Sequence, residues 1–165
     1  MSAHSLQLRV WLEDGENLAE LIKAYMALYQ PITAAGGLVY TPNQQLLMIH
    51  RKGWWDLPKG KQDPGEDLLT CAVREVKEET LIPEITPGRK FGVTWHIYKL
   101  NNTWILKDSH WYYMESKEAY PLQPQTEEEI TAAVWMDASQ RKNLIPEMYP
   151  LIAELVKWAD LRKDL

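Results

Sequence analysis

The chain has 165 residues, of which 45% are hydrophobic, and its 23 acidic and 18 basic residues give a net charge of −5. This length and composition are typical of one folded domain and exclude disorder for most of the chain. The acidic balance argues against a surface for duplex nucleic acid, and no stretch approaches the roughly 18 apolar residues of a membrane span. Since the single cysteine, Cys71, cannot form an internal disulfide, we expect a cytoplasmic protein.

The first thirty residues predict a small N-terminal extension. A strand is expected over residues 6–12, followed by a helix from about Asn17 to Tyr29 that Pro31 ends. The apolar residues of this helix recur at helical spacing, as in a helix that covers a sheet: Leu18, Leu21, Ile22, Tyr25 and Leu28. We therefore divide the chain into an extension, residues 1–31, and a domain, residues 32–165. A role of the extension in protein interaction or dimerisation stays open.

Short strand-like runs separated by turns dominate the chain from residue 32 onward. Strands are predicted over residues 33–40, 46–50, 91–100, 103–107, 111–114 and 132–136. Turn residues at 41–43 and at Asn101-Asn102 predict two hairpins, and residues 54–59 read as a strand that runs into a loop. Helical patterns cover residues 66–80 and roughly 146–164. A mixed α/β domain is expected.

The first of these helical patterns lies within residues 60–82, which read GKQDPGEDLLTCAVREVKEETLI. On a helical wheel the apolar side chains fall on one stripe of about 100°, the width of a face that packs on a sheet. The stripe consists of Leu69, Ala72, Val73, Val76 and Thr80. We predict that this side of the helix is buried.

Three glutamates, Glu75, Glu78 and Glu79, share the adjoining arc at the edge of the buried stripe. Like charges at this spacing destabilise a helix by roughly 0.2–0.5 kcal/mol per pair, so a cation is expected to join them. Carboxylate oxygens without His or thiolate partners suit Mg²⁺ or Mn²⁺. Such a site fits phosphoanhydride hydrolysis, since the ion neutralises phosphate charge and activates water while a further carboxylate takes the proton. On the helix alone, a solvated face with pairs such as Arg74 with Glu78 is the alternative.

The spacing around the helix resembles the Nudix hydrolase signature, G-x5-E-x7-R-E-U-x-E-E-x-G-U, in which U is a bulky apolar residue. Eight of its nine fixed positions match: Gly60, Glu66, Arg74, Glu75, Val76, Glu78, Glu79 and Ile82. The remaining position, a glycine in the family, is Leu81. The resemblance implies a Nudix-type α/β/α sandwich around a mixed β-sheet and a Mg²⁺-dependent pyrophosphohydrolase.

The resemblance also implies roles for the matching residues. Glu78 and Glu79 would be metal ligands, and Glu75 a ligand or the residue that activates water. Arg74 would orient the glutamates through a salt bridge, and Glu66 would support the loop and helix. The resulting catalytic set is Glu75, Arg74 and Glu78.

Three neighbouring features extend the comparison with the family. The glycine at Gly37 often lends its carbonyl to the metal in Nudix proteins, although Gly36-Gly37 also suits a strand bulge. A late glutamate that serves as a further ligand or base would be one of residues 127–129, with the others in a solvated turn. Because Leu81 in a left-handed conformation costs roughly 1–2 kcal/mol, we expect the helix to end differently from the family's, with help from Pro83.

The run WDLPKGKQDPGED, residues 55–67, resembles the diadenosine polyphosphate hydrolase branch of the family. Lys59, Lys61 and Arg51 are predicted to meet substrate phosphates, with ordinary loop solubility as the alternative for each. Tyr98 belongs to a set of strand aromatics on which a base could stack, half of which alternation sends into the core: Trp95, Tyr98, Trp111, Tyr112 and Tyr113. The histidines are read as structural: His50, His96 and His110.

These features predict a hydrolase that cuts a phosphoanhydride bond in a nucleoside diphosphate-linked small molecule, with a dinucleoside polyphosphate as first candidate. ADP-ribose or another nucleotide sugar is the alternative within the same chemistry. A Nudix-fold module that senses a nucleotide without cutting it is the alternative from a different class, and a homodimer is compatible with the family.

Overall fold

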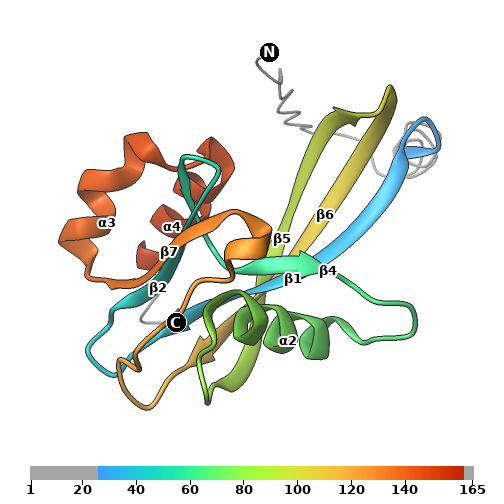
Figure 1. Ribbon diagram of the computed structural model, residues 1–165. Coiled ribbons are helices and arrows are strands. Elements are labelled where there is room, and N and C mark those ends of the chain that lie inside the picture. Colours follow the sequence, from blue (N-terminus) through green and yellow to red (C-terminus); the bar gives the residue numbers. More distant parts are fainter. Residues whose placement is uncertain (1–25, 162–165) are drawn as a thin grey trace.

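The computed structural model describes residues 26–161. Two parallel strands, β1 (Gln30–Tyr40) and β6 (Thr103–Glu115), form the centre of its seven-stranded mixed sheet (Figure 1). The main strand order is β3-β2-β1-β6-β5, with β4 beside β1 and β7 beside β2. The remaining strands are β2 (Leu46–Arg51), β3 (Trp54–Asp56), β4 (Lys59–Lys61), β5 (Thr86–Leu100) and β7 (Ile130–Met136).

The structure confirms the predicted strands and both hairpins, with two of the strands merged. Residues 103–107 and 111–114 belong to the single strand β6, because the polar residues between them pair with both β1 and β5. In the first turn, the amide of Gln44 donates to the Thr41 carbonyl at 2.9 Å. Asn101 and Asn102 adopt φ values of 46° and 66°, the conformation of a two-residue turn between antiparallel strands.

Helices cover both faces of the sheet, which is the predicted sandwich (Figure 1). On one face α2 (Leu68–Thr80) packs its Ala72 and Val76 against β1. On the other face α4 (Pro150–Leu161) closes a second core, and α3 (Ala138–Leu144) lies beside it. Short 3-10 turns occupy Thr126–Glu128 and Ile145–Glu147.

The helix boundaries agree with the prediction for α2 and differ near the C-terminus. Asp67 caps α2, since its side chain accepts the amides of Leu69 and Thr70 at 3.0 Å each. The predicted helix over 146–164 begins only at Pro150, and α3 was not predicted. A capping box of Asp137 and Gln140 marks the start of α3 in the sequence, but its seven residues are too few for a clear helical period.

The expectation that Leu81 ends α2 differently from the family is wrong. Leu81 adopts the left-handed conformation, φ 51° and ψ 28°, and its amide donates to the Lys77 carbonyl at 2.8 Å. Contacts on both sides hold it there: Ile82 is buried, and the carbonyl of Thr80 accepts the amide of Gln123 at 3.0 Å. The surrounding structure therefore offsets the strain of a side chain at a position that favours glycine.

The predicted strand over residues 6–12 and most of the helix over 17–29 lie outside the described residues. At their boundary the Tyr29 amide donates to the Met26 carbonyl, and β1 begins directly afterwards, so Pro31 lies within a strand. The division into residues 1–31 and 32–165 remains a prediction. Within residues 26–161, no helix is long and apolar enough to cross a membrane.

Candidate active site

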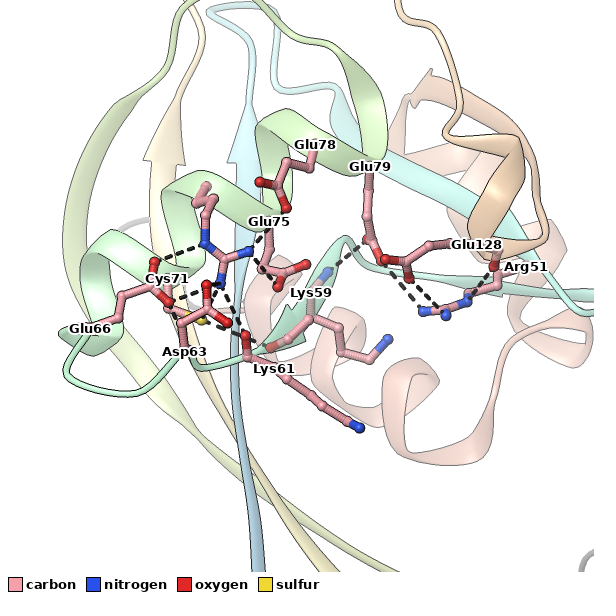
Figure 2. Close-up of polar contacts among 12 residues, drawn as sticks. Arg51, Lys59, Lys61, Asp63, Glu66, Cys71, Glu75, Glu78, Glu79 and Glu128 are labelled. Atoms are coloured by element: carbon pink, nitrogen blue, oxygen red, sulfur yellow. Dashed lines mark hydrogen bonds and ion pairs between the residues drawn. The ribbon is translucent and has the colours of Figure 1, made fainter. Parts of the chain in front are cut away.

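The three glutamates of α2 differ in burial more than their shared arc suggested. Glu79 is 0% exposed and Glu75 is 6% exposed, whereas the Glu78 side chain is 51% exposed. Figure 2 shows all three on the side of α2 that faces the strand carrying Lys59 and Lys61. The buried side of the helix therefore includes two carboxylates together with Ala72, Val76 and Thr80 of the predicted stripe, whereas Leu69 and Val73 are half-buried.

Arg74 is the centre of a charge network that links α2 to the preceding loop. Its partners Lys61, Glu66, Glu75 and Glu78 are labelled in Figure 2. Its Nη1 donates to Glu75 Oε1 at 2.8 Å and to Glu78 Oε2 at 3.0 Å. Its Nε and Nη2 both donate to the Glu66 carboxylate at 2.8 Å, and Nη2 also reaches the Lys61 carbonyl at 3.0 Å. The pair of Arg74 with Glu78, expected for a solvated helix face, is thus present. It is one contact of a network in which Arg74 also holds the Glu66 and Glu75 carboxylates and the loop at Lys61.

Burial controls the protonation of these carboxylates. Desolvation raises the pKa of Glu79 to about 7, although the positive charges of Lys59 and Arg51 oppose the shift. Desolvation also raises the pKa of Glu75, against the effect of Arg74. The hydrogen bonds from Arg74 lower the pKa of Glu66. Glu75 and Glu79 are therefore carboxylates whose negative charge is incompletely compensated by the protein.

Two groups contact the buried Glu79 carboxylate. The backbone amide of Lys59, the first residue of β4, donates to Glu79 Oε2 at 2.9 Å. Arg51 Nη1 lies 3.4 Å from Glu79 Oε1. Arg51 ends β2 and is followed by a tight turn in which Lys52 and Gly53 have φ values of 54° and 84°. This turn places the Arg51 side chain at the end of the glutamate cluster.

Among the three adjacent glutamates at 127–129, the structure brings Glu128 to this cluster. Arg51 donates from Nη2 to Glu128 Oε2 at 2.9 Å and from Nε to the Glu128 carbonyl at 3.0 Å (Figure 2). Glu129 instead pairs with Lys52 at 2.9 Å. Glu127 lines a hollow of about 480 Å³ that Glu78 and Leu81 also line. A second hollow, of about 220 Å³, lies between β5 and α4 and contains none of the α2 glutamates.

Lys59 has a partner that the sequence did not reveal. Its Nζ lies 2.6 Å from Oδ2 of Asp56, which is 4% exposed and also accepts the Leu57 amide at 2.7 Å. One of the three ammonium donors of Lys59 is thereby used. Lys61 is exposed, and its carbonyl accepts a bond from Arg74. No local spacing marks Asp56, because its contacts form only where the loop before β4 folds back.

Gly37 is required by packing. A Cβ at Gly37 would lie 2.9 Å from both Met114 Sδ and Val76 Cγ2, so the glycine lets α2 approach the sheet. Its amide donates to the Pro58 carbonyl at 3.2 Å. The predicted contribution of its own carbonyl to a metal stays a prediction.

The remaining predicted residue, Tyr98, lies on β5 beside His96, with ring centroids 5.3 Å apart, and contacts none of the α2 glutamates. The other two histidines have partners that fit a structural role. His50 Nδ1 lies 2.7 Å from Thr131 Oγ1, and His110 Nε2 lies 2.7 Å from Asp108 Oδ2.

No three carboxylate, imidazole or thiol groups within residues 26–161 lie close enough together to hold a metal ion as they stand. Protein donors already bind these carboxylates: Arg74 bridges Glu75 and Glu78, while Glu79 accepts the Lys59 amide and pairs with Arg51. A metal would therefore have to draw these flexible side chains together.

Comparison with known proteins identifies the family. The NUDIX domain family model matches residues 30–159. The uncharacterized Nudix hydrolase YvcI of Bacillus subtilis (strain 168) is 34% identical over 105 residues, which cover 60% of this chain and 61% of that protein. The chain covers less than two thirds of the length of the curated relatives that it matches.

Solved structures of low sequence identity share the fold. A C. elegans Ap4A hydrolase superimposes with a TM-score of 0.60 at 22% identity, over 76% of this chain and 93% of the other. A bifunctional NMN adenylyltransferase/ADP ribose pyrophosphatase from Francisella tularensis, complexed with AMP and a Mn ion, superimposes with a TM-score of 0.64 at 16% identity. The match covers 87% of this chain and 45% of the other. With the family match spanning nearly all of the described residues, the chain belongs to the Nudix family.

Proposed function

We propose that this protein is a Mg²⁺-dependent hydrolase that cuts a phosphoanhydride bond in a nucleoside diphosphate-linked substrate. The observation that carries the proposal is the cluster of Glu75, Glu78 and Glu79, of which two are buried with incompletely compensated charge. A merely structural helix face would expose such glutamates to water, where their charge costs little.

The residues present fit a hard divalent cation. The donors are carboxylate oxygens, which Mg²⁺ and Mn²⁺ prefer, and burial raises the pKa of Glu79, so a cation bound there would stabilise its anion. We assign Glu75, Glu78 and Glu79 as ligands, with the Gly37 carbonyl and Glu128 as additional candidates. When bound, the ion would neutralise phosphate charge and lower the pKa of a water molecule.

The protein's own groups then have separate tasks. Glu75, held by Arg74 at 2.8 Å, is the carboxylate that we assign to accept the proton from the attacking water. Arg74 positions Glu75 and Glu78, and Glu66 fixes Arg74 in turn. Arg51, Lys59 and Lys61 supply positive charge for substrate phosphates, and Tyr98 offers a ring for a base.

Two observations bear on the alternatives. All of the family's signature glutamates are present, which favours an enzyme over a module that senses a nucleotide without cutting it. Two substrate classes remain candidates, a dinucleoside polyphosphate and a nucleotide sugar, since the fold neighbours include both an Ap4A hydrolase and an ADP ribose pyrophosphatase.

Product identification separates these substrates. Purified protein with Mg²⁺ is incubated with diadenosine tetraphosphate, nucleoside triphosphates and ADP-ribose, and the products are resolved by ion-exchange chromatography. We expect the fastest turnover with diadenosine tetraphosphate. Faster release of AMP from ADP-ribose would favour the nucleotide-sugar alternative instead.

Metal-free protein should lose stability as the pH rises from about 4.5 to 7. Unfolded Glu79 loses its proton near 4.5, whereas the folded protein retains it to about 7, so the folded state binds more protons in this window. The shift of about 2.5 units, at 1.36 kcal/mol per unit, sets an upper limit of about 3.4 kcal/mol on the fall in the free energy of unfolding. Urea unfolding in EDTA at several pH values measures this fall.

The control for this measurement is Glu79→Gln, which should remove most of the pH dependence in that window. The comparison is needed because the pKa of Glu75 is also raised by burial, so this carboxyl contributes to stability with the same sign. Adding Mg²⁺ at pH 7 should restore stability to the wild type. An identical pH profile in wild type and variant would contradict the burial argument.

A further inference from the structure

A cationic patch formed by Lys59, His96 and Lys107 lies on the face of the sheet opposite α2. His96 and Lys107 are direct cross-strand partners in the β5–β6 ladder, and Lys107 is the partner of Ile32 on β1. Lys59 is the partner of Gly36 on β1, four residues from Ile32. Because strand side chains alternate with period two, all three side chains project from the same face.

Two of the three groups, Lys59 and Lys107, are cations at neutral pH, because the lowered pKa of His96 leaves its imidazole uncharged. The charge of Lys59 disfavours the charged form of the half-buried Lys107. Among the described residues, no carboxylate forms an ion pair with Lys107, and the Asp56 carboxylate is already bonded to Lys59 at 2.6 Å. Desolvation, followed by the charge of Lys59, lowers the pKa of Lys107 to about 8. Desolvation and Lys107 likewise lower the pKa of His96.

The patch is connected to the glutamate cluster through Lys59. The amide of Lys59 donates to Glu79, while its side chain extends away from α2, as does that of Lys61 (Figure 2). Lys107 is close enough to Arg51 and Glu79 for their charges to influence it. Lys59 therefore contacts the glutamate cluster through its amide and contributes its side chain to the patch on the opposite face.

We propose that Lys107 and His96, together with Lys59, bind a phosphate group of the substrate that lies outside the diphosphate being cut. The inference rests on the proposed function and deepens it, because it selects substrates with three or more phosphates over diphosphate-linked nucleotide sugars. A phosphate supplies the charge that the patch lacks and can accept bonds from several donors at once. The sequence did not reveal the site, since its members come from three strands with no shared spacing.

The first test measures binding without catalysis. Inorganic tripolyphosphate is titrated into metal-free wild type and into Lys107→Met by isothermal calorimetry in EDTA. We expect the dissociation constant to increase about tenfold in the variant, the size of one charge-assisted contact, and a smaller increase in His96→Gln. The control is Lys99→Met, since Lys99 is on the same hairpin with its ammonium over the Trp104 ring, and it should bind as the wild type does.

Equal binding by wild type and Lys107→Met, or no binding by the wild type, would overturn the inference. Thermal unfolding distinguishes a folding defect: removing Lys107 relieves repulsion, so the variant should unfold at the same or a higher temperature. If Lys107→Met unfolds at a lower temperature than the wild type, the binding of tripolyphosphate is compared between the wild type and Lys107→Gln and His96→Gln instead. Unchanged binding in both variants contradicts the proposal.

The second test uses the selectivity between substrates. Lys107→Met should raise the KM for a nucleoside triphosphate or diadenosine tetraphosphate about tenfold while changing kcat little and leaving the KM for ADP-ribose unaltered. Equal effects on all substrates would contradict a phosphate site beyond the cut bond. If no substrate is turned over, the proposed function fails, whereas tripolyphosphate binding still decides the role of the patch.

Discussion

Replacement of Glu79 by glutamine should reduce kcat by at least about 100-fold, the range for a lost metal ligand or proton acceptor, and leave the fold intact. Glutamine has the same shape and can still accept the Lys59 amide bond, but it cannot provide the anion that the buried position offers to a cation. Steady-state kinetics with Mg²⁺ on the best substrate of the panel measures the effect, and circular dichroism verifies the fold.

Glu84→Gln is the matched control, because Glu84 is an exposed glutamate that pairs with Lys117 at 2.7 Å. It should retain wild-type kcat and KM. Near-normal kcat in Glu79→Gln would mean that the buried carboxylate has a structural role only, and the metal assignment for α2 would then be wrong.

Gly60→Ala should lower kcat about 100-fold, the cost of displacing a catalytic group by about 1 Å. A Cβ at Gly60 would overlap the Glu75 carboxylate, so Glu75 would have to rotate away from its bond with Arg74. The overlapping atoms are the far end of a flexible side chain, so the free energy of unfolding should change little. Kinetics and urea unfolding on the same sample measure both quantities.

The control for this substitution is Gly92→Ala. Gly92 also lies in a strand, and a Cβ there meets no other atom within 4 Å. If Gly60→Ala retains full activity, the position of Glu75 is not important for the reaction. If both variants lose activity equally, the loss reflects a general effect of alanine in the sheet.

The sequence predicted those parts of the site that lie close together along the chain. Arg74, Glu75, Glu78 and Glu79 are within one helix, whose period gives their relative positions, and Asp67 caps that helix as local chemistry requires. The fixed spacing to Gly60 and Glu66 then distinguished the cluster from an ordinary solvated face.

The rest of the site depends on contacts between distant segments. Glu128 could not be selected from its neighbours, because the choice depends on a turn in which Glu129 adopts a left-handed conformation, φ 62°. Lys107 belongs to no motif, and its relation to Lys59 arises only from the pairing of strands. Asp56 is three residues from Lys59, but no local pattern predicts that the loop between them brings the two side chains together. Leu81 was misjudged for a similar reason, since contacts of Thr80 and Ile82 decide the conformation that local propensity disfavours.

Metal-dependent phosphoanhydride hydrolysis can be measured as product release from a broad panel of nucleoside diphosphate-linked compounds. Each compound is incubated with the purified protein in Mg²⁺, in Mn²⁺ and in EDTA, in water enriched in oxygen-18. We expect turnover of at least one compound with either metal, none in EDTA, and one heavy oxygen in a phosphate product. No turnover of any compound with either metal, or equal turnover in EDTA, would contradict the proposed function.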